Sequence, residues 1–272
     1  MMNEQAIILP GVGNARELGG YRIGDKTVRK GRLLRTGKLT QATPEAITLL
    51  SEKYRVQAIV DFRMSSEEHN NPDPEIPGVI YRHLPVFEIE EMMEGASPES
   101  IAFYGEHVND RMAMFEYCYE HKVIDENLYV KFILNDRGRE VVREFFRLLL
   151  EVEEGRSFLW HCSDGKDRAG CGAMLILSAL GADRELILKD YLLTNEFNAG
   201  KLDALRAKVA PMNMPGDKLN LLLFMSGCVF PAYMESIIDA MTERYGSVIG
   251  YLEKEIGIDE EKREKLKKAF LE

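Results

Sequence analysis

Cysteine is scarce in this chain: 272 residues contain only four, and no two of them have the C-x2-C spacing of a zinc site. A chain of this length does not need disulfide bonds to stabilise its fold, so we expect four reduced thiols. We expect no metal ion and no other cofactor. The cysteines are Cys118, Cys162, Cys171 and Cys228.

Long apolar runs are also missing. No stretch approaches the roughly 18 apolar residues of a membrane helix, so stable membrane insertion is not expected. The first ten residues lack a basic start and a long apolar segment, which predicts no signal peptide and a cytoplasmic location, with secretion by another route left open. The net charge of −10 argues against nucleic acid as a partner, because a negative field repels polyanions. Any anionic ligand must therefore be bound by a local positive site.

Apolar runs that end in polar residues alternate with helical patterns along the first 180 residues. This order predicts an α/β fold with a central, mostly parallel sheet of about four or five strands flanked by helices. The glycine-rich opening at residues 10–21 is expected to be loop. The expected strands are residues 33–36, 57–63, 79–86 and 157–161, and the expected helices are residues 43–53, 140–151 and 169–180.

The chain shows no internal repeat, and we expect residues 1–272 to form a single domain. Residues 88–135 are rich in Met, Phe, Tyr and acidic residues and are expected to be helical. They form either an ordinary part of the core or a mobile lid over a site. Residues 182–272 are expected to be the helical C-terminal part of the same domain.

The loop between the strand at residues 157–161 and the next helix carries the strongest chemical signal. Cys162 and Arg168 are separated by five residues, with Gly165 inside the loop. A tight loop at a helix N-terminus directs N–H groups inward and binds an anion, and Arg168 offers a planar fork for two phosphate oxygens. The same positive field favours the thiolate form of Cys162, which is the nucleophilic form. The predicted phosphate-binding residues are Ser163, Asp164, Gly165, Lys166, Asp167 and Arg168.

Two carboxyl groups are candidates for the proton donor to the leaving group. Asp167 lies inside the loop, and Asp61 lies near the end of a neighbouring predicted strand. His161 is expected to hydrogen-bond the backbone. Arg16 and Arg63 are expected either to line the pocket or to hold Asp61.

Residues 161–170 resemble the signature loop of bacterial protein tyrosine phosphatases that contain Gly-Lys-Asp-Arg, a branch with dual-specificity and phosphoinositide phosphatases. Other segments, both before and after this loop, are similar to sequence motifs of that family. These segments are residues 14–20, 60–63, 190–195 and 245–248. The resemblance therefore spans nearly the whole chain.

This resemblance implies a tyrosine-phosphatase fold and a phosphocysteine mechanism. It implies that Asp167 is the general acid, that Asp61 is a second active-site aspartate, and that Lys166 binds extra phosphates or a lipid headgroup. From the residues alone, Lys166 could equally pair with Asp61 or Asp164. The chain departs from the family at Ala169, where Ser or Thr is usual, and at Asp164, where a small uncharged residue is common.

The sequence thus predicts a metal-independent phosphomonoester hydrolase that acts on phosphotyrosine, with phosphoserine, phosphothreonine and phosphoinositides left open. Its partners would be a phosphorylated protein or a phosphoinositide. The alternative is a weak pseudophosphatase that binds phosphorylated ligands, which Ala169 favours. Sulfur or arsenate chemistry at Cys162 is a third interpretation, but no resolving cysteine is evident. The sequence does not indicate the oligomeric state.

Overall fold

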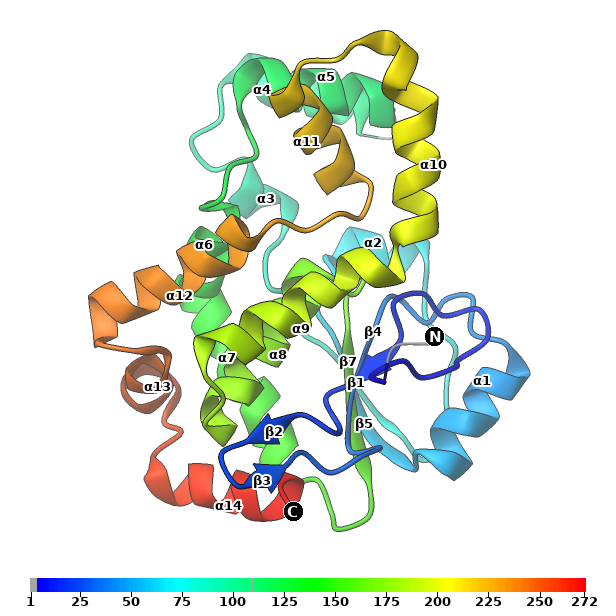
Figure 1. Ribbon diagram of the computed structural model, residues 1–272. Coiled ribbons are helices and arrows are strands. Elements are labelled where there is room, and N and C mark those ends of the chain that lie inside the picture. Colours follow the sequence, from blue (N-terminus) through cyan, green and yellow to red (C-terminus); the bar gives the residue numbers. More distant parts are fainter. Residues whose placement is uncertain (1–3, 109) are drawn as a thin grey trace.

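The computed structural model of the protein describes residues 4–108 and 110–272. A five-stranded sheet with the order β1-β4-β7-β5-β6 lies at its centre (Figure 1). The neighbours β4, β7, β5 and β6 pair in parallel, and β1 pairs antiparallel with β4. The α/β fold with a mostly parallel sheet is thereby confirmed. The strands are β1 (Arg16–Glu17), β4 (Leu33–Thr36), β5 (Val56–Asp61), β6 (Ile80–His83) and β7 (Ser157–His161), with a separate hairpin of β2 (Arg22–Ile23) and β3 (Lys26–Thr27).

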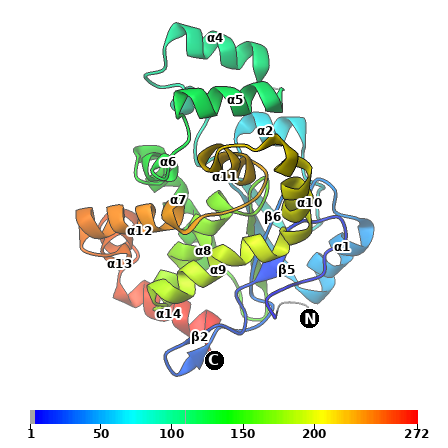
Figure 2. The same cartoon turned by 45° about the horizontal axis from the view of Figure 1, so that its top comes forward.

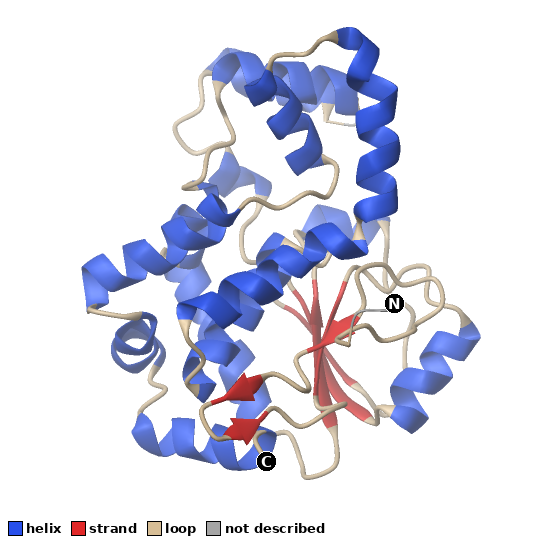
Figure 3. Ribbon diagram, viewed as in Figure 1, coloured by secondary structure: helices blue, strands red, loops and turns tan. Residues whose placement is uncertain are grey.

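Helices surround this sheet (Figure 3). In the first half of the chain they are α1 (Pro44–Thr48), η1 (Leu49–Lys53), α2 (Ser65–Asn70), α3 (Ile89–Met92), α4 (Pro98–His107), α5 (Arg111–His121), α6 (Leu128–Ile133) and α7 (Asp136–Leu150). In the second half they are α8 (Asp167–Leu180), α9 (Arg184–Phe197), α10 (Ala199–Val209), η2 (Ala210–Met212), α11 (Gly216–Met225), α12 (Pro231–Tyr245), α13 (Val248–Tyr251), η3 (Leu252–Ile256) and α14 (Glu260–Phe270). No helix within these described residues is long and apolar enough to cross a membrane.

The inner strands β4, β5 and β7 are buried on both faces because they carry apolar residues at consecutive positions, whereas the edge strand β6 is largely exposed. One face, with Leu34, Ile59 and Leu159, packs in a cluster with residues of α1 and η1. The other face, with Phe158 and Trp160, joins the larger cluster that contains α7 and α8. The two apolar clusters therefore hold the sheet in place, and the polar residues at its strand ends are available for a functional site.

Four helices form what we call the cap: α4, α5, α10 and α11. They stand together beyond one end of the sheet, and α10 extends from the end of α9 toward them (Figures 1 and 2). Lys218 of α11 pairs with Glu116 of α5, and its ammonium lies 5.0 Å from the ring centre of Tyr119. Two segments far apart in the sequence are thus joined within the cap.

Several local predictions differ from the structure. The strands predicted over residues 57–63 and 79–86 are Val56–Asp61 and Ile80–His83. The predicted helix over residues 43–53 starts at Thr43, which caps it, but its second half is the π-helix η1, in which the N–H of Tyr54 donates to the carbonyl of Leu49 at 2.9 Å. The opening predicted as loop contains β1, which is only two residues long. A strand this short shows no alternating pattern, so only its pairing with β4 defines it.

Candidate active site

Three strands end side by side at the site. In the register of the sheet, His161 at the end of β7 pairs with Thr36 at the end of β4 and with Asp61 at the end of β5. The chain then turns through Cys162–Lys166 and enters α8 at Asp167. The carboxyl edge of the parallel sheet therefore carries the Cys162–Arg168 loop, as the sequence predicted.

The carbonyl groups of this loop are turned outward and are all bonded. The N–H of Lys38 donates to the carbonyl of Ser163 at 3.2 Å. Asn14 Nδ2 donates to the carbonyls of Asp164 and Gly165, each at 3.0 Å. Arg35 donates to the carbonyl of Gly165 at 3.1 and 3.2 Å and to that of Lys166 at 2.8 Å.

A buried charge network holds Asn14 and Arg35 in turn. Arg35 Nη1 lies 2.5 Å from Asp190 Oδ2, and Arg16 bonds Asn14 Oδ1, the carbonyl of Asp190 and Thr194 Oγ1. Burial, followed by repulsion from Arg35, lowers the pKa of Arg16 to about 10, and Asp190 counters the shift. Two buried guanidiniums beside one carboxylate leave a surplus positive charge just behind the loop.

With its carbonyls turned outward, the loop presents its N–H groups to the opposite side. Within residues 4–108 and 110–272, none of the N–H groups from Ser163 to Ala169 donates a hydrogen bond. The turn requires glycine at position 165, where φ is +67° and a Cβ would come within 2.6 Å of the Thr36 carbonyl group. A ring of free N–H groups at a helix N-terminus is an anion-binding geometry.

Cys162 lies at the start of this ring and is 2% exposed. Burial raises the pKa of the other three thiols, Cys118, Cys171 and Cys228, which makes them poor nucleophiles. Cys162 is also the one cysteine of the four that lies in the Cys162–Arg168 loop.

Arg168 is held by a carboxylate that the sequence analysis missed. Glu67 of α2 accepts from Arg168 Nη1 at 2.5 Å and from Nη2 at 3.1 Å, and it also accepts from Ser163 Oγ. Burial alone would raise the pKa of Glu67, but Arg168 and Ser163 bring it to about 2. The guanidinium also lies 5.3 Å from the ring centre of Phe87. Arg168 Nε donates to no described residue, so that edge of the fork is available to a ligand.

Asp167 is buried and accepts hydrogen bonds from two phenols. Tyr191 Oη donates to its Oδ1 at 2.7 Å, and Tyr129 Oη donates to its Oδ2 at 3.1 Å. Burial and the charge of Asp167 raise the pKa of both tyrosines well above the usual value, so both stay protonated. Lys166 Nζ lies 3.2 Å from Asp167 Oδ2. Three donors thus converge on this carboxylate.

The side chain of Lys166 does not face an incoming phosphate, contrary to the predicted role. Its Nζ donates to the carbonyl of Phe224 at 2.6 Å and to that of Cys228 at 3.3 Å, and it lies 3.7 Å from the ring centre of Phe224. Nor does it pair with Asp61 or Asp164, the other expectation. It ties the loop to the end of α11, and only its backbone N–H faces the ring.

Asp61 lies in a separate, fully buried network. Arg63 donates to both of its oxygens, and Tyr81 Oη donates to Oδ2 at 2.7 Å. Burial raises the pKa of Asp61, but His161 and then Arg63 outweigh it and bring the pKa to about 2. These contacts do not support the predicted role of Asp61 as proton donor; they make it a support for the strand ends. Arg63 likewise holds Asp61 and does not line a pocket.

His161 stands between two carboxylates. Its Nε2 lies 3.0 Å from Asp73 Oδ2, and its Nδ1 lies 3.7 Å from Asp61 Oδ1. The same Nδ1 lies 3.3 Å from the carbonyl of Cys162, in line with the predicted backbone contact. Asp61, Asp73 and His161 are ligand types that hold metal ions. Here, however, Arg63 Nη2 already lies 2.7 and 2.8 Å from the two carboxylates and supplies the positive charge.

Several residues of the site left little signal in the sequence. Glu67 and Asp73 lie in a polar helix and a loop, where carboxylates are common, and Tyr129 lies in the segment predicted as core or lid. Asp190, Tyr191 and Thr194 lie in a segment that resembles the family. The only sign in the sequence that Asp190 and Thr194 both contact Arg16 is their i, i+4 spacing on α9.

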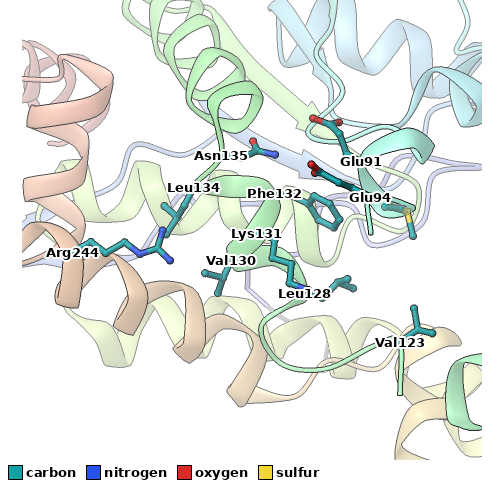
Figure 4. Close-up of a pocket in the computed structure, with 11 residues that line it drawn as sticks. Glu91, Glu94, Val123, Leu128, Val130, Lys131, Phe132, Leu134, Asn135 and Arg244 are labelled. Atoms are coloured by element: carbon teal, nitrogen blue, oxygen red, sulfur yellow. The ribbon is translucent and has the colours of Figure 1, made fainter. Parts of the chain in front are cut away.

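Burial, and then the charge of Glu67, raise the pKa of Tyr104 in α4. A cavity of about 460 Å3 lies elsewhere, where Glu91 and Glu94 near α3 face α6 and Arg244 (Figure 4). Its lining includes no residue of the Cys162–Arg168 loop.

Comparison with known proteins agrees with this geometry. A family model described as the tyrosine phosphatase family matches residues 7–272. A Cupriavidus necator protein, named provisionally as a tyrosine-protein phosphatase, is 28% identical over 251 residues, which cover 91% of this chain and 83% of the relative. The triple specificity protein phosphatase PtpB of Mycobacterium tuberculosis is 26% identical over 267 residues, covering 90% and 91% of the two chains. A tyrosine-protein phosphatase of Nostoc commune is 23% identical over 244 residues, covering 85% and 70%.

Proposed function

The chain belongs to the tyrosine phosphatase family and is a protein phosphatase, and from that premise we propose that it hydrolyses phosphotyrosine through a phosphocysteine on Cys162. The observation that carries this proposal is the orientation of the Cys162–Arg168 loop. Its carbonyls are held from behind by Asn14 and Arg35 while its N–H groups stay free. That arrangement suits the three non-bridging oxygens of a phosphate ester.

In the first step, the thiolate of Cys162 attacks phosphorus. A P–S bond forms while the ester P–O bond breaks, and the electron pair of that bond leaves with the tyrosyl oxygen. The loop N–H groups and the free Nε edge of Arg168 stabilise the negative charge on the equatorial oxygens. In the second step, water attacks the phosphocysteine, releases inorganic phosphate and restores the thiolate. Since N–H groups and Arg168 supply the charge stabilisation, the proposed mechanism requires no metal ion.

Asp167 is the proposed proton donor to the leaving oxygen. The contacts from Tyr129, Tyr191 and Lys166 fix the position of its carboxyl group beside the loop. A phenoxide leaves more easily than an alkoxide, so this site favours phosphotyrosine over phosphoserine, phosphothreonine and phosphoinositides. Asp61, Arg63, Arg16 and His161 take supporting roles in this proposal.

Turnover of p-nitrophenyl phosphate and of a phosphotyrosyl peptide tests the proposal. Cys162→Ser should abolish turnover of both while the variant still binds phosphate, because the ring of N–H groups remains. Cys171→Ser is the matched control, since that buried thiol lies one helical turn into α8, and it should remain active. Activity retained by Cys162→Ser, or no turnover by the parent protein, would show that the proposal is wrong.

A further inference from the structure

A second hollow, of about 200 Å3, lies on the outer side of the Cys162–Arg168 loop. Ser163 and Asp164 of the loop line it together with Lys38, Gln41 and Lys201. We call it the lysine hollow. It lies beside the proposed phosphate site, because Ser163 lines the hollow while its Oγ donates to Glu67 at the Arg168 pair.

Both lysines lack an ion-pair partner among the residues that the structure describes, and Gln41 makes no side-chain hydrogen bond there. Lys38 is anchored beside the loop, since its backbone N–H donates to the carbonyl of Ser163. Lys201 comes from the start of α10 and is exposed. Most other cations near the loop are already bonded: Arg35 to Asp190, Arg168 to Glu67 and Lys166 to backbone carbonyls.

The charge balance of the hollow favours an anion. The residues that line it include two lysines and one carboxylate, that of Asp164, which gives the lining a surplus of one positive charge on a chain whose net charge is −10. Without such a local site, this chain would repel an acidic ligand. Asp164, an unexpected carboxylate at a phosphate-binding loop, is thereby offset by its two lysine neighbours.

The size of the hollow indicates what it takes. Pockets that enclose whole small molecules measure about 300–1,000 Å3, so a hollow of about 200 Å3 suits a single anionic group. We propose that the lysine hollow binds a second phosphorylated side chain of the same peptide, next to the phosphotyrosine whose phosphate enters the Cys162 ring. This inference rests on the proposed function and makes doubly phosphorylated peptides the preferred substrates.

The experiment compares a singly phosphorylated tyrosyl peptide, the same peptide with a neighbouring phosphoserine, and an inositol bisphosphate. The parent protein should show a KM about fivefold to tenfold lower for the doubly phosphorylated peptide, given the modest strength of partly exposed ion pairs. The double variant Lys38→Ala, Lys201→Ala should lose that preference with kcat unchanged and with p-nitrophenyl phosphate turnover unaffected. Lys208→Ala, an exposed lysine on the same helix, is the matched control and should keep the preference.

Lys201→Glu alone should raise the KM for the doubly phosphorylated peptide further, and it serves where the double variant folds poorly. Equal KM values for the two peptides in the parent, or a preference that survives both lysine changes, would overturn the inference. So would a preference shown only for the inositol bisphosphate. Binding of the two peptides to the Cys162→Ser variant, measured by calorimetry, tests the hollow without turnover. Failure of the inference about the lysine hollow can therefore be distinguished from failure of the proposed function.

Discussion

Glu67→Gln is the most informative single change, because it tests how Arg168 is held. Glu67 Oε2 accepts from Arg168 Nη1 and from the N–H of Met64, and Oε1 accepts from Arg168 Nη2 and Ser163 Oγ. Glutamine keeps the shape of the side chain. It removes the charge, however, and sets an NH2 group against donors.

The expected loss follows from the strength of these bonds. Hydrogen bonds to charged groups contribute about 1.5–3 kcal/mol, and each 1.4 kcal/mol changes a rate about tenfold. If Glu67 fixes the guanidinium with its Nε edge toward phosphate, kcat/KM should fall about 10- to 100-fold. The inhibition constant for inorganic phosphate should rise along with this loss, because both depend on the orientation of Arg168.

The assay measures kcat/KM with p-nitrophenyl phosphate and inhibition by inorganic phosphate, with circular dichroism to confirm folding. Glu68→Gln is the control: this neighbouring carboxylate makes no hydrogen bond or ion pair with the described residues, and its variant should behave as the parent protein does. Higher activity in Glu67→Gln would refute the reasoning, because Glu67 would then compete with substrate for Arg168. Unchanged activity and inhibition would show that Arg168 is positioned without it.

Four further predictions concern the loop and its supports. Asp167→Asn should slow alkyl phosphates at least tenfold more than p-nitrophenyl phosphate, since only poor leaving groups need the proton; equal losses in a leaving-group series would exclude Asp167 as the acid. Ala169→Ser should speed hydrolysis of the phosphocysteine, because a hydroxyl helps the sulfur leave, and rapid-quench burst kinetics that do not change would contradict this. Chelation by EDTA should leave turnover intact, whereas activity restored only by added metal would contradict the mechanism. Asp61 has its pKa lowered from 3.8 to about 2, so it contributes about 2 kcal/mol of stability above pH 4 that is lost as the pH falls toward 2; Asp61→Asn should flatten acid unfolding in that range, and an unchanged acid transition would show that the carboxylate is not stabilised by folding.

The strand ends and the loop that carry the site could be predicted from local residue patterns. The apolar runs that end in His161 and Asp61 predicted parallel strands whose carboxyl ends meet, and the register pairs those two residues. The spacing of Cys162 and Arg168 around Gly165 predicted the anion-binding turn. Such features are local: strand burial, a glycine with positive φ and a helix start depend on neighbouring residues in the chain, so their patterns can be found in sequence.

Which charged side chains face a ligand could not be predicted in this way, because it depends on contacts between distant parts of the chain. Lys166 and Asp61 were predicted near phosphate, but burial against Phe224 and Arg63 turns both inward. Glu67, at a position without pattern, instead holds the arginine of the loop. An ion pair forms where packing brings two opposite charges together. When the two residues are far apart in the sequence, no periodic sequence pattern indicates the pair. The fold of this protein was therefore evident from local chemistry, whereas the roles of its charged residues depended on long-range contacts.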